Sequence, residues 1–342
     1  PDDESYKWRA VLLLGAVCRE WRDITLATPH LWSTVNIWLG RKELWSDIAN
    51  KWLQRSGALP LSITFTYAEY GESITDFDLV PVLRSHSIRW KSLTFNYVRD
   101  DIFYRLLDNL EDTRHIKTIR IYCKAGSWGK MRPFMGEPIR PKTFHWSILT
   151  GIAYFKWDNL TRLVAEQIHI DDLIDILRQA IKIQHCIIQS SIRENEHQLV
   201  PIINQSLMHL DIELQGLTDI LPFLTLPSLQ ILECRSNDSM EHVDIDALVN
   251  FIDRSQAPLR DVIYHLTVSW YAPAGFWDPI FPNITHLKLD IISDDPTTML
   301  INVFELLAYD QDEIALPSVQ VIELTTKCMS PTVWSHFINL FP

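Results

Sequence analysis

The sequence predicts an α/β solenoid, in which strand-and-helix units stack so that their short strands form a parallel sheet on the concave face. Two observations lead to this fold class. The first is a template of three apolar residues that recurs along the chain, with two residues between the first and second and one residue between the second and third. The second is that amphipathic helical stretches separate the instances of this template. The length of 342 residues and the apolar share of 47% are sufficient for a large core. A small all-α module is expected to precede the repeats.

The expected helical module covers residues 1–57. Apolar residues return at intervals of three and four between residues 10 and 26, which predicts a helix with a broad apolar stripe. Thr28 is placed to cap a second short helix with Pro29 in its first turn. A third helix is predicted over residues 41–55, followed by Gly57 as its C-terminal cap. The module joins directly to a solenoid over residues 58–342.

The repeats of this solenoid are identified by the template, which matches nine times and once more weakly before the others. Each match ends in alternating apolar residues, the pattern of a short strand with one buried face. The step between matches averages about 29 residues. The central residues of the matches are Ile63 (the weaker one), Leu93, Ile119, Leu163, Cys186, Leu210, Leu232, Val262, Leu287 and Ile322.

Helical stretches over residues 171–180, 244–254 and 297–308 lie between matches, each with an acidic residue or Thr at its front. One strand and one helix per roughly 20 to 29 residues is the arrangement of irregular leucine-rich repeats, although several steps here are longer. A lone unit cannot bury its apolar face, so neighbouring units must stack. The alternative is an ordinary α/β protein. The phrase Leu-Pro-Ser-apolar-Gln-apolar, which occurs at 226–231 and again at 316–321, favours repeats.

A target-binding surface is expected on the concave sheet face. Side chains between and after the last two apolar template positions project from this face, because side chains alternate along a strand. In the later repeats they are polar, mixed in sign and mildly acidic, and a basic or polar peptide segment would complement them. The alternative is a solvated strand face without a binding role. The candidate residues are His209, Asp211, Glu213, Glu233, Arg235, His286, Lys288, Asp290 and Glu323.

The longest step between matches contains an insert over residues 124–158. It holds three Trp residues and, between 124 and 156, six basic residues against one acidic residue. Such a loop fits an acidic or phosphorylated partner segment. The alternatives are a loop that covers a solenoid edge and a degenerate extra repeat over residues 144–155.

Composition and motifs restrict the function class. The formal net charge of -12 lacks the basic footprint of a general nucleic-acid binder, so a protein partner is expected. The apolar run at 10–18 is too short to span a membrane. We expect no cofactor, metal site or catalytic constellation: the five cysteines are widely separated, and the adjacent His185 and Cys186 point to opposite faces of a strand. Apolar settings for Cys18, Cys186 and Cys234 suit a reducing compartment, cytoplasm or nucleus, whereas four Asn-x-Ser/Thr sequons suit a secreted protein.

Residues 17–24 (VCREWRDI) and 28–32 (TPHLW) resemble the second half of an F-box. The phrases SGALPLSITF (56–65), LRSHSIRWKSLTF (83–95), LPSLQILE (226–233) and FIDRSQAPLR (251–260) are similar to those of the F-box-like, leucine-rich-repeat proteins abundant in fungi. The resemblance implies a non-enzymatic substrate-recognition subunit of a Skp–cullin–F-box ubiquitin ligase, whose F-box helices bind the Skp adaptor and whose repeats choose a target protein. The opening residues PDDESYKWRA lack the family's initial Leu-Pro-acid-Ile phrase. The residues that match the F-box pattern are Leu13, Leu14, Val17, Cys18, Trp21, Ile24, Pro29, Leu31 and Trp32.

A second interpretation of the same apolar residues remains open. Terminal repeats of a solenoid need covering, and a helical cap would use such residues for packing alone. The chain would then be a protein-interaction scaffold outside the ubiquitin system.

Overall fold

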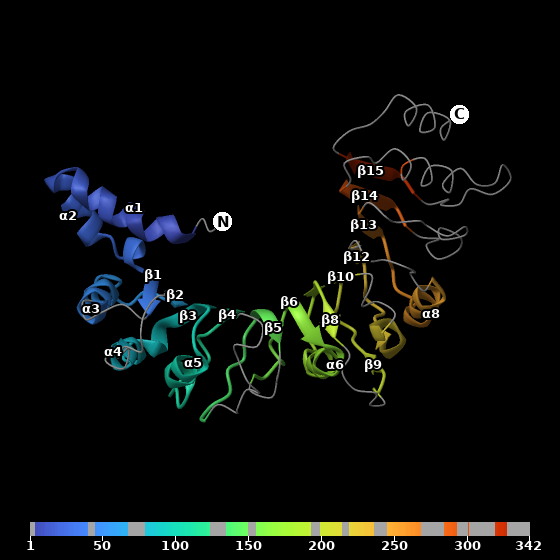
Figure 1. The fold of residues 1–342 in the computed structure, drawn as a ribbon, viewed down its shortest axis with the longest axis horizontal. Coiled ribbons are helices and arrows are strands. Elements are labelled where there is room, and N and C mark those ends of the chain that lie inside the picture. Colours follow the sequence, from blue (N-terminus) through green and yellow to red (C-terminus); the bar gives the residue numbers. More distant parts are fainter. Residues whose placement is uncertain are drawn as a thin grey trace. The chain divides into compact units, whose positions relative to one another are not determined.

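The chain folds into parallel strands with helices along one side of them (Figure 1). The α/β class and the parallel pairing expected from the sequence are thereby confirmed. The chain divides into two compact units, unit 1 (Pro1–Leu160) and unit 2 (Thr161–Pro342), while the predicted domain boundary after residue 57 stays a prediction. This computed structural model describes residues 4–39, 45–67, 79–123, 135–149, 155–192, 199–213, 219–235, 245–267, 284–292, 300 and 319–326.

Unit 1 begins with helices and continues as a parallel sheet in the order β1-β2-β3-β4-β5. The strands are β1 (Thr34–Leu39), β2 (Leu61–Tyr67), β3 (Trp90–Asn96), β4 (Thr118–Tyr122) and β5 (Thr143–Leu149). Figure 1 shows α3, α4 and α5 following one another along one side of this sheet. The helical elements are α1 (Glu4–Val17), α2 (Arg19–Ala27), η1 (Pro29–Trp32), α3 (Trp45–Arg55), α4 (Leu79–Arg84), η3 (Ser87–Arg89) and α5 (Asp100–Leu107).

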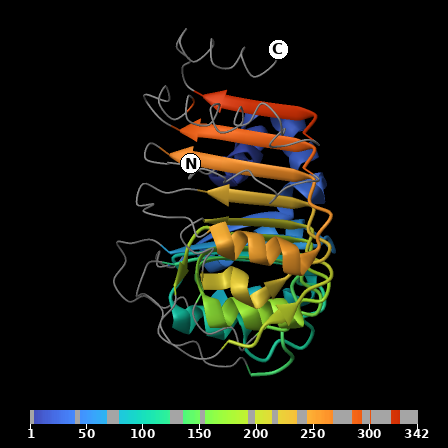
Figure 2. The ribbon, with the colours of Figure 1, turned by 90° about the vertical axis from the view of Figure 1, so that its right-hand side faces the viewer.

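Unit 2 has the strand order β6-β7-β10-β12-β13-β14-β15, with β8 paired to β6 and a separate β11–β9 pair. Figure 2 shows its later strands, in yellow to red, side by side and pointing the same way. The strands are β6 (Arg162–His169), β7 (His185–Ile188), β8 (Ser191–Ile192), β9 (Ile202–Ile203), β10 (His209–Glu213), β11 (Leu224–Thr225), β12 (Ile231–Arg235), β13 (Asp261–Thr267), β14 (His286–Ile292) and β15 (Val321–Thr326). The helical elements are α6 (Ile170–Gln179), η4 (Leu221–Phe223) and α8 (Ile245–Ser255).

The template residues form the core of each sheet, because equivalent positions pair with one another. In unit 1, Ile63 pairs with Leu93 and Leu93 with Ile119. In unit 2, Leu210 lies between Cys186 and Leu232. All the central template residues lie in strands and are buried, except Ile322, which is half-buried. Paired strands therefore bring their apolar residues together in register.

The N-terminal module differs from the all-α prediction, because strand β1 lies inside it. The alternation of buried Val35 and Ile37 with half-buried Thr34 and Asn36 is that of a strand with one core face. The third helix is confirmed as α3 from Trp45 onward, and its end is followed by Gly57 at φ +58°, a left-handed conformation that favours glycine.

Two further expectations about caps and stripes are corrected. The stripe over residues 10–26 is split into α1 and α2 at Cys18, whose backbone is extended. Thr28 precedes η1, yet its hydroxyl donates to the carbonyl of Ile24 (2.7 Å) and does not cap the helix that follows.

The remaining sequence predictions are met in part. Helices α6 and α8 correspond to the predicted stretches 171–180 and 244–254, whereas 297–308 lies outside the described residues, apart from Leu300. Within the insert 124–158, β5 adds a strand to the sheet, and its Phe144 and Trp146 pack with Phe155 and Trp157. Residues 124–134 and 150–154 of the insert lie outside the described part. None of the helices in that part is long and apolar enough to cross a lipid bilayer.

Candidate functional site

Helices α1 and α2 form a hairpin that turns at one residue. Cys18 is extended (φ -156°, ψ 178°), and its Sγ accepts a hydrogen bond from the Trp21 amide at 3.5 Å, so it acts as the N-cap of α2. The Arg22 Nε donates to the Gly15 carbonyl at 2.9 Å and ties α2 to the end of α1. The turn is therefore fixed by local bonds.

This hairpin leaves large apolar side chains in solvent. Leu13, Val17 and Ile24 are 67%, 66% and 64% exposed. A large exposed apolar surface is uncommon on a monomer and is typical of interaction sites. We call the following set the apolar helix face: Leu12, Leu13, Val17, Trp21, Ile24 and Leu26.

The structure sorts the predicted adaptor-binding residues into two groups. Leu14 and Leu31 are half-buried, and Trp32 is buried. The Trp32 Nε1 donates to the Thr25 carbonyl at 2.8 Å, and its ring packs on Trp52 at 4.7 Å between centroids. Trp32 thus links α2 to α3. The exposed group is Leu13, Val17, Cys18, Trp21, Ile24 and Pro29.

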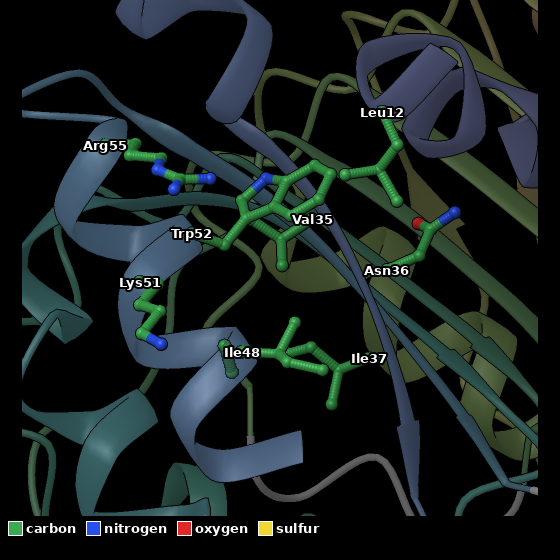
Figure 3. A pocket seen from close by; sticks show the side chains of 9 residues that line it. Leu12, Val35, Asn36, Ile37, Ile48, Lys51, Trp52 and Arg55 are labelled. Carbon is green, nitrogen blue, oxygen red and sulfur yellow. The ribbon is translucent and has the colours of Figure 1, made fainter. Parts of the chain in front are cut away.

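A largely apolar pocket of about 290 Å³ adjoins the apolar helix face, because Leu12 belongs to both (Figure 3). Side chains from α1, β1 and α3 line it. Figure 3 shows Ile48 and Ile37 pointing toward each other across the pocket. Lys51 and Arg55 add two cations, and Arg55 lies over the Trp32 ring at 4.5 Å. Sequence reasoning missed this pocket, because it depends on how β1 packs against α1 and α3.

Unit 2 carries a connected set of ionisable side chains on the sheet face opposite its template residues. Arg235 on β12 binds Asp211 on β10 in a bidentate pair, with Nε–Oδ1 at 2.8 Å and Nη2–Oδ2 at 2.6 Å. The Arg235 Nη2 also donates to Glu233 Oε1 at 3.0 Å. We call the whole set the ionic ladder: Asp211, Arg235, Glu233, His209, His265 and Asp290.

His265 on β13 continues this ladder by facing two carboxylates. Its Nε2 lies 2.7 Å from Glu233 Oε1, and its Nδ1 lies 3.1 Å from Asp290 Oδ2. A ring protonated at both nitrogens donates to both acids, whereas a neutral ring donates to one only. The His209 Nε2 approaches the other oxygen of Glu233 at 3.3 Å. The ladder thus spans β10, β12, β13 and β14.

Partners and burial shift the pKa values along the ladder in opposite directions. Hydrogen bonds from His209 and His265 hold the pKa of Glu233 well below its ordinary value. Burial raises the pKa of Asp211, and the Arg235 guanidinium opposes this shift. The hydrogen bonds with Asp211 raise the pKa of Arg235. Glu233 is therefore more firmly ionised than Asp211.

The predicted target-contacting residues all lie on this sheet face, but Asp211 does not reach solvent. It is 1% exposed beneath Arg235, so its role is to hold Arg235. Sequence reasoning missed His265 and Asp261 on β13, although the same alternation that selected their neighbours also selects His265. Glu323 on β15 reaches solvent, with a side chain that is 51% exposed.

Other chemistry suggested by single residues has no support in the described part of the chain. Cys186 is fully buried, and burial raises its pKa to about 12, which removes the nucleophilic thiolate. No group of three His, Cys, Asp or Glu suited to a metal ion occurs among the described residues. Against known proteins, no family model and no curated protein matches the chain.

Proposed function

We propose that this chain is a substrate-recognition adaptor of a Skp–cullin–F-box type ubiquitin ligase. In this proposal its α1–α2 hairpin is a degenerate F-box-like module that docks the Skp adaptor. The remaining strands and helices form an irregular leucine-rich-repeat solenoid whose concave face recruits a target protein. The chain itself is non-catalytic and works in the cytoplasm or nucleus.

The single observation that supports adaptor docking is the apolar helix face. The residues that resemble an F-box divide into three that pack inward and six that stay exposed. Exposing Leu13, Val17 and Ile24 is unfavourable for a monomer, and burial of one such side chain in an interface is worth about 1.5–3 kcal/mol. A partner that covers this face gains that free energy.

The target surface of the proposal is the unit 2 sheet face with the ionic ladder. Glu323 is exposed, His286 is partly exposed, and the ladder fixes Glu233 in the ionised state. Such a surface favours a basic or polar segment of the target by charge complementarity.

The second candidate function is a scaffold in which the hairpin only caps the repeats. Buried Val11, Thr25 and Trp32 favour it, because they pack the hairpin onto unit 1 whether or not a partner binds. The two functions differ in their use of the apolar helix face: adaptor docking needs its exposed side chains, whereas a cap does not.

The test is binding of the purified Skp adaptor to the folded chain and to two triple variants. Changing Leu13, Val17 and Ile24 to Ser is expected to weaken adaptor binding at least a hundredfold while leaving the unfolding midpoint within a few degrees. The matched control changes Ile88, Ile181 and Ile203 to Ser, which are 61%, 68% and 69% exposed elsewhere. Absence of binding at micromolar concentration, or equal binding by both variants, removes the ligase function and leaves the scaffold.

A further inference from the structure

The unit 1 sheet has an outward face of very different chemistry from that of unit 2. On strands β1 to β5, the side chains that alternate with the buried core are almost all hydroxyls, amides or aromatic rings. Asn96 Nδ2 donates to Thr66 Oγ1 at 3.4 Å, and the Tyr122 hydroxyl bonds His145 Nδ1 at 3.2 Å. We call the following set the neutral face: Thr34, Asn36, Trp38, Ser62, Thr64, Thr66, Ser92, Thr94, Asn96, Thr118, Arg120, Tyr122, Thr143, His145 and Ser147.

Arg120 is the single Lys, Arg, Asp or Glu of the neutral face. It lies in the middle of β4, beside Thr94 on β3 and His145 on β5. It is half-buried and has no hydrogen-bond or ion-pair partner among the residues that the structure describes. Arg235, at the matching kind of position in unit 2, binds two carboxylates. Within the described residues, Arg120 is thus an unpaired guanidinium at the centre of a sheet face that carries no other charged side chain. Such a group is suited to binding an anion.

The charge of the two units supports the same assignment. Unit 1 has 22 Lys and Arg against 18 Asp and Glu, a net charge of +4. Unit 2 has 9 against 25, a net charge of -16. An anionic segment is therefore attracted to unit 1 and repelled by unit 2.

We propose that the neutral face binds an extended segment of a partner protein and that Arg120 anchors an anionic group on it, a carboxylate or a phosphoryl group. The guanidinium forms two parallel hydrogen bonds with the anionic oxygens. The hydroxyl of half-buried Thr118 beside it donates to or accepts from the segment's backbone. This surface goes beyond the proposed function, because it depends neither on the apolar helix face nor on the ionic ladder.

The test uses three pools of synthetic 13-residue peptides with degenerate flanks and a fixed central Glu, phosphoserine or Lys. Binding of the labelled full chain to each immobilised pool is measured without any adaptor present. The Glu or phosphoserine pool is expected to retain the protein, and the Lys pool is not. Arg120→Ala is expected to reduce retention tenfold or more, and Arg120→Lys is expected to restore part of it, because a lysine keeps the charge and loses the bidentate geometry.

The matched control is Lys91→Ala, which removes one positive charge from the neighbouring strand at an exposed position outside the neutral face. It is expected to change retention less than twofold. Equal effects of the two substitutions, preference for the Lys pool, or no retention of the folded protein by any pool would each overturn the proposal. The Glu and phosphoserine arms distinguish a carboxylate from a phosphoryl group. Loss of adaptor docking leaves this readout unchanged, so the two proposals fail independently.

Discussion

Asn204 shows how much a single buried amide contributes to unit 2. It is 4% exposed, and its Nδ2 donates to the carbonyls of Leu177 and Ala180 at 2.9 and 3.1 Å. Its Oδ1 accepts from the amides of Ser206 and Leu207, both at 3.1 Å. One side chain thus satisfies the end of α6 and the turn before β10. Asn204 begins a sequon, but in the folded chain its amide is fully engaged and closed to an oligosaccharide.

Replacing Asn204 by Ala is expected to destabilise the protein by about 3 kcal/mol, because buried carbonyls and amides lose their partners. Asn204→Asp is expected to be no better, since a carboxylate has no hydrogen to donate to the two carbonyls. Urea unfolding followed by circular dichroism measures both effects. Gln205→Ala is the control, because Gln205 is exposed. A change below about 1 kcal/mol for Asn204→Ala would contradict the account.

His185 links stability to pH. Burial lowers its pKa, and His209, whose ring centroid lies 5.6 Å away, and Arg162 lower it further. The unfolded chain therefore takes up a proton on this histidine at a higher pH than the folded chain does. Its contribution to stability is present above the unfolded pKa of about 6.5 and is lost as pH falls through the lower folded pKa.

His185→Gln is expected to flatten the fall in stability between about pH 7 and pH 5. The urea midpoints of the wild type and the variant at pH 7.5, 6.5 and 5.5 provide the comparison, with the exposed His30→Gln as the control. If the difference between wild type and variant is the same at all three values, the pKa of His185 does not differ between the folded and unfolded states.

Among the elements, the strands were the most predictable, because burial of one face imposes a period of two on the sequence. The template located ten strands and their in-register partners. It also fits β1 at Trp32, Val35 and Ile37, and β5 at Phe144 and Trp146 after Pro141, two matches absent from the prediction. Trp32 therefore occupies a template position, although it also completes the phrase that resembles an F-box.

What the sequence could not reveal depends on three-dimensional packing. A cysteine is a rare N-cap, so nothing local announced the break at Cys18. The ion pair that holds buried Asp211 comes from Arg235 on another strand. That no acid lies beside Arg120 can be recognised only from the register of β3, β4 and β5, because this register brings together residues more than twenty positions apart.

The strands also provide an internal reporter of their own opening. Cys186 and Cys234 are buried in β7 and β12, and burial raises the pKa of both thiols, that of Cys186 to about 12, whereas Cys18 is exposed. A thiol-disulfide reagent is expected to modify Cys18 at least a hundredfold faster than either strand cysteine in native buffer. Peptide mapping by mass spectrometry after timed labelling measures the three rates, and denaturing urea should equalise them. Equal rates without urea would show that unit 2 opens freely.

At the scale of the whole molecule, two units with the same architecture have opposite charge. Both build their cores from aligned apolar residues, so the charge difference lies in the residues outside those cores. Unit 1 exposes hydroxyls around one arginine, and unit 2 exposes histidines and acids. The overall net charge of -12 describes neither unit.

This division of charge influences which proteins approach each unit before any contact is made. In dilute salt, the long-range field draws cationic proteins to unit 2 and anionic ones to unit 1, and physiological ionic strength shortens the reach of both fields to about 8 Å. Encounter rates with the two kinds of protein should therefore both fall as salt is added, even though the chain as a whole is acidic.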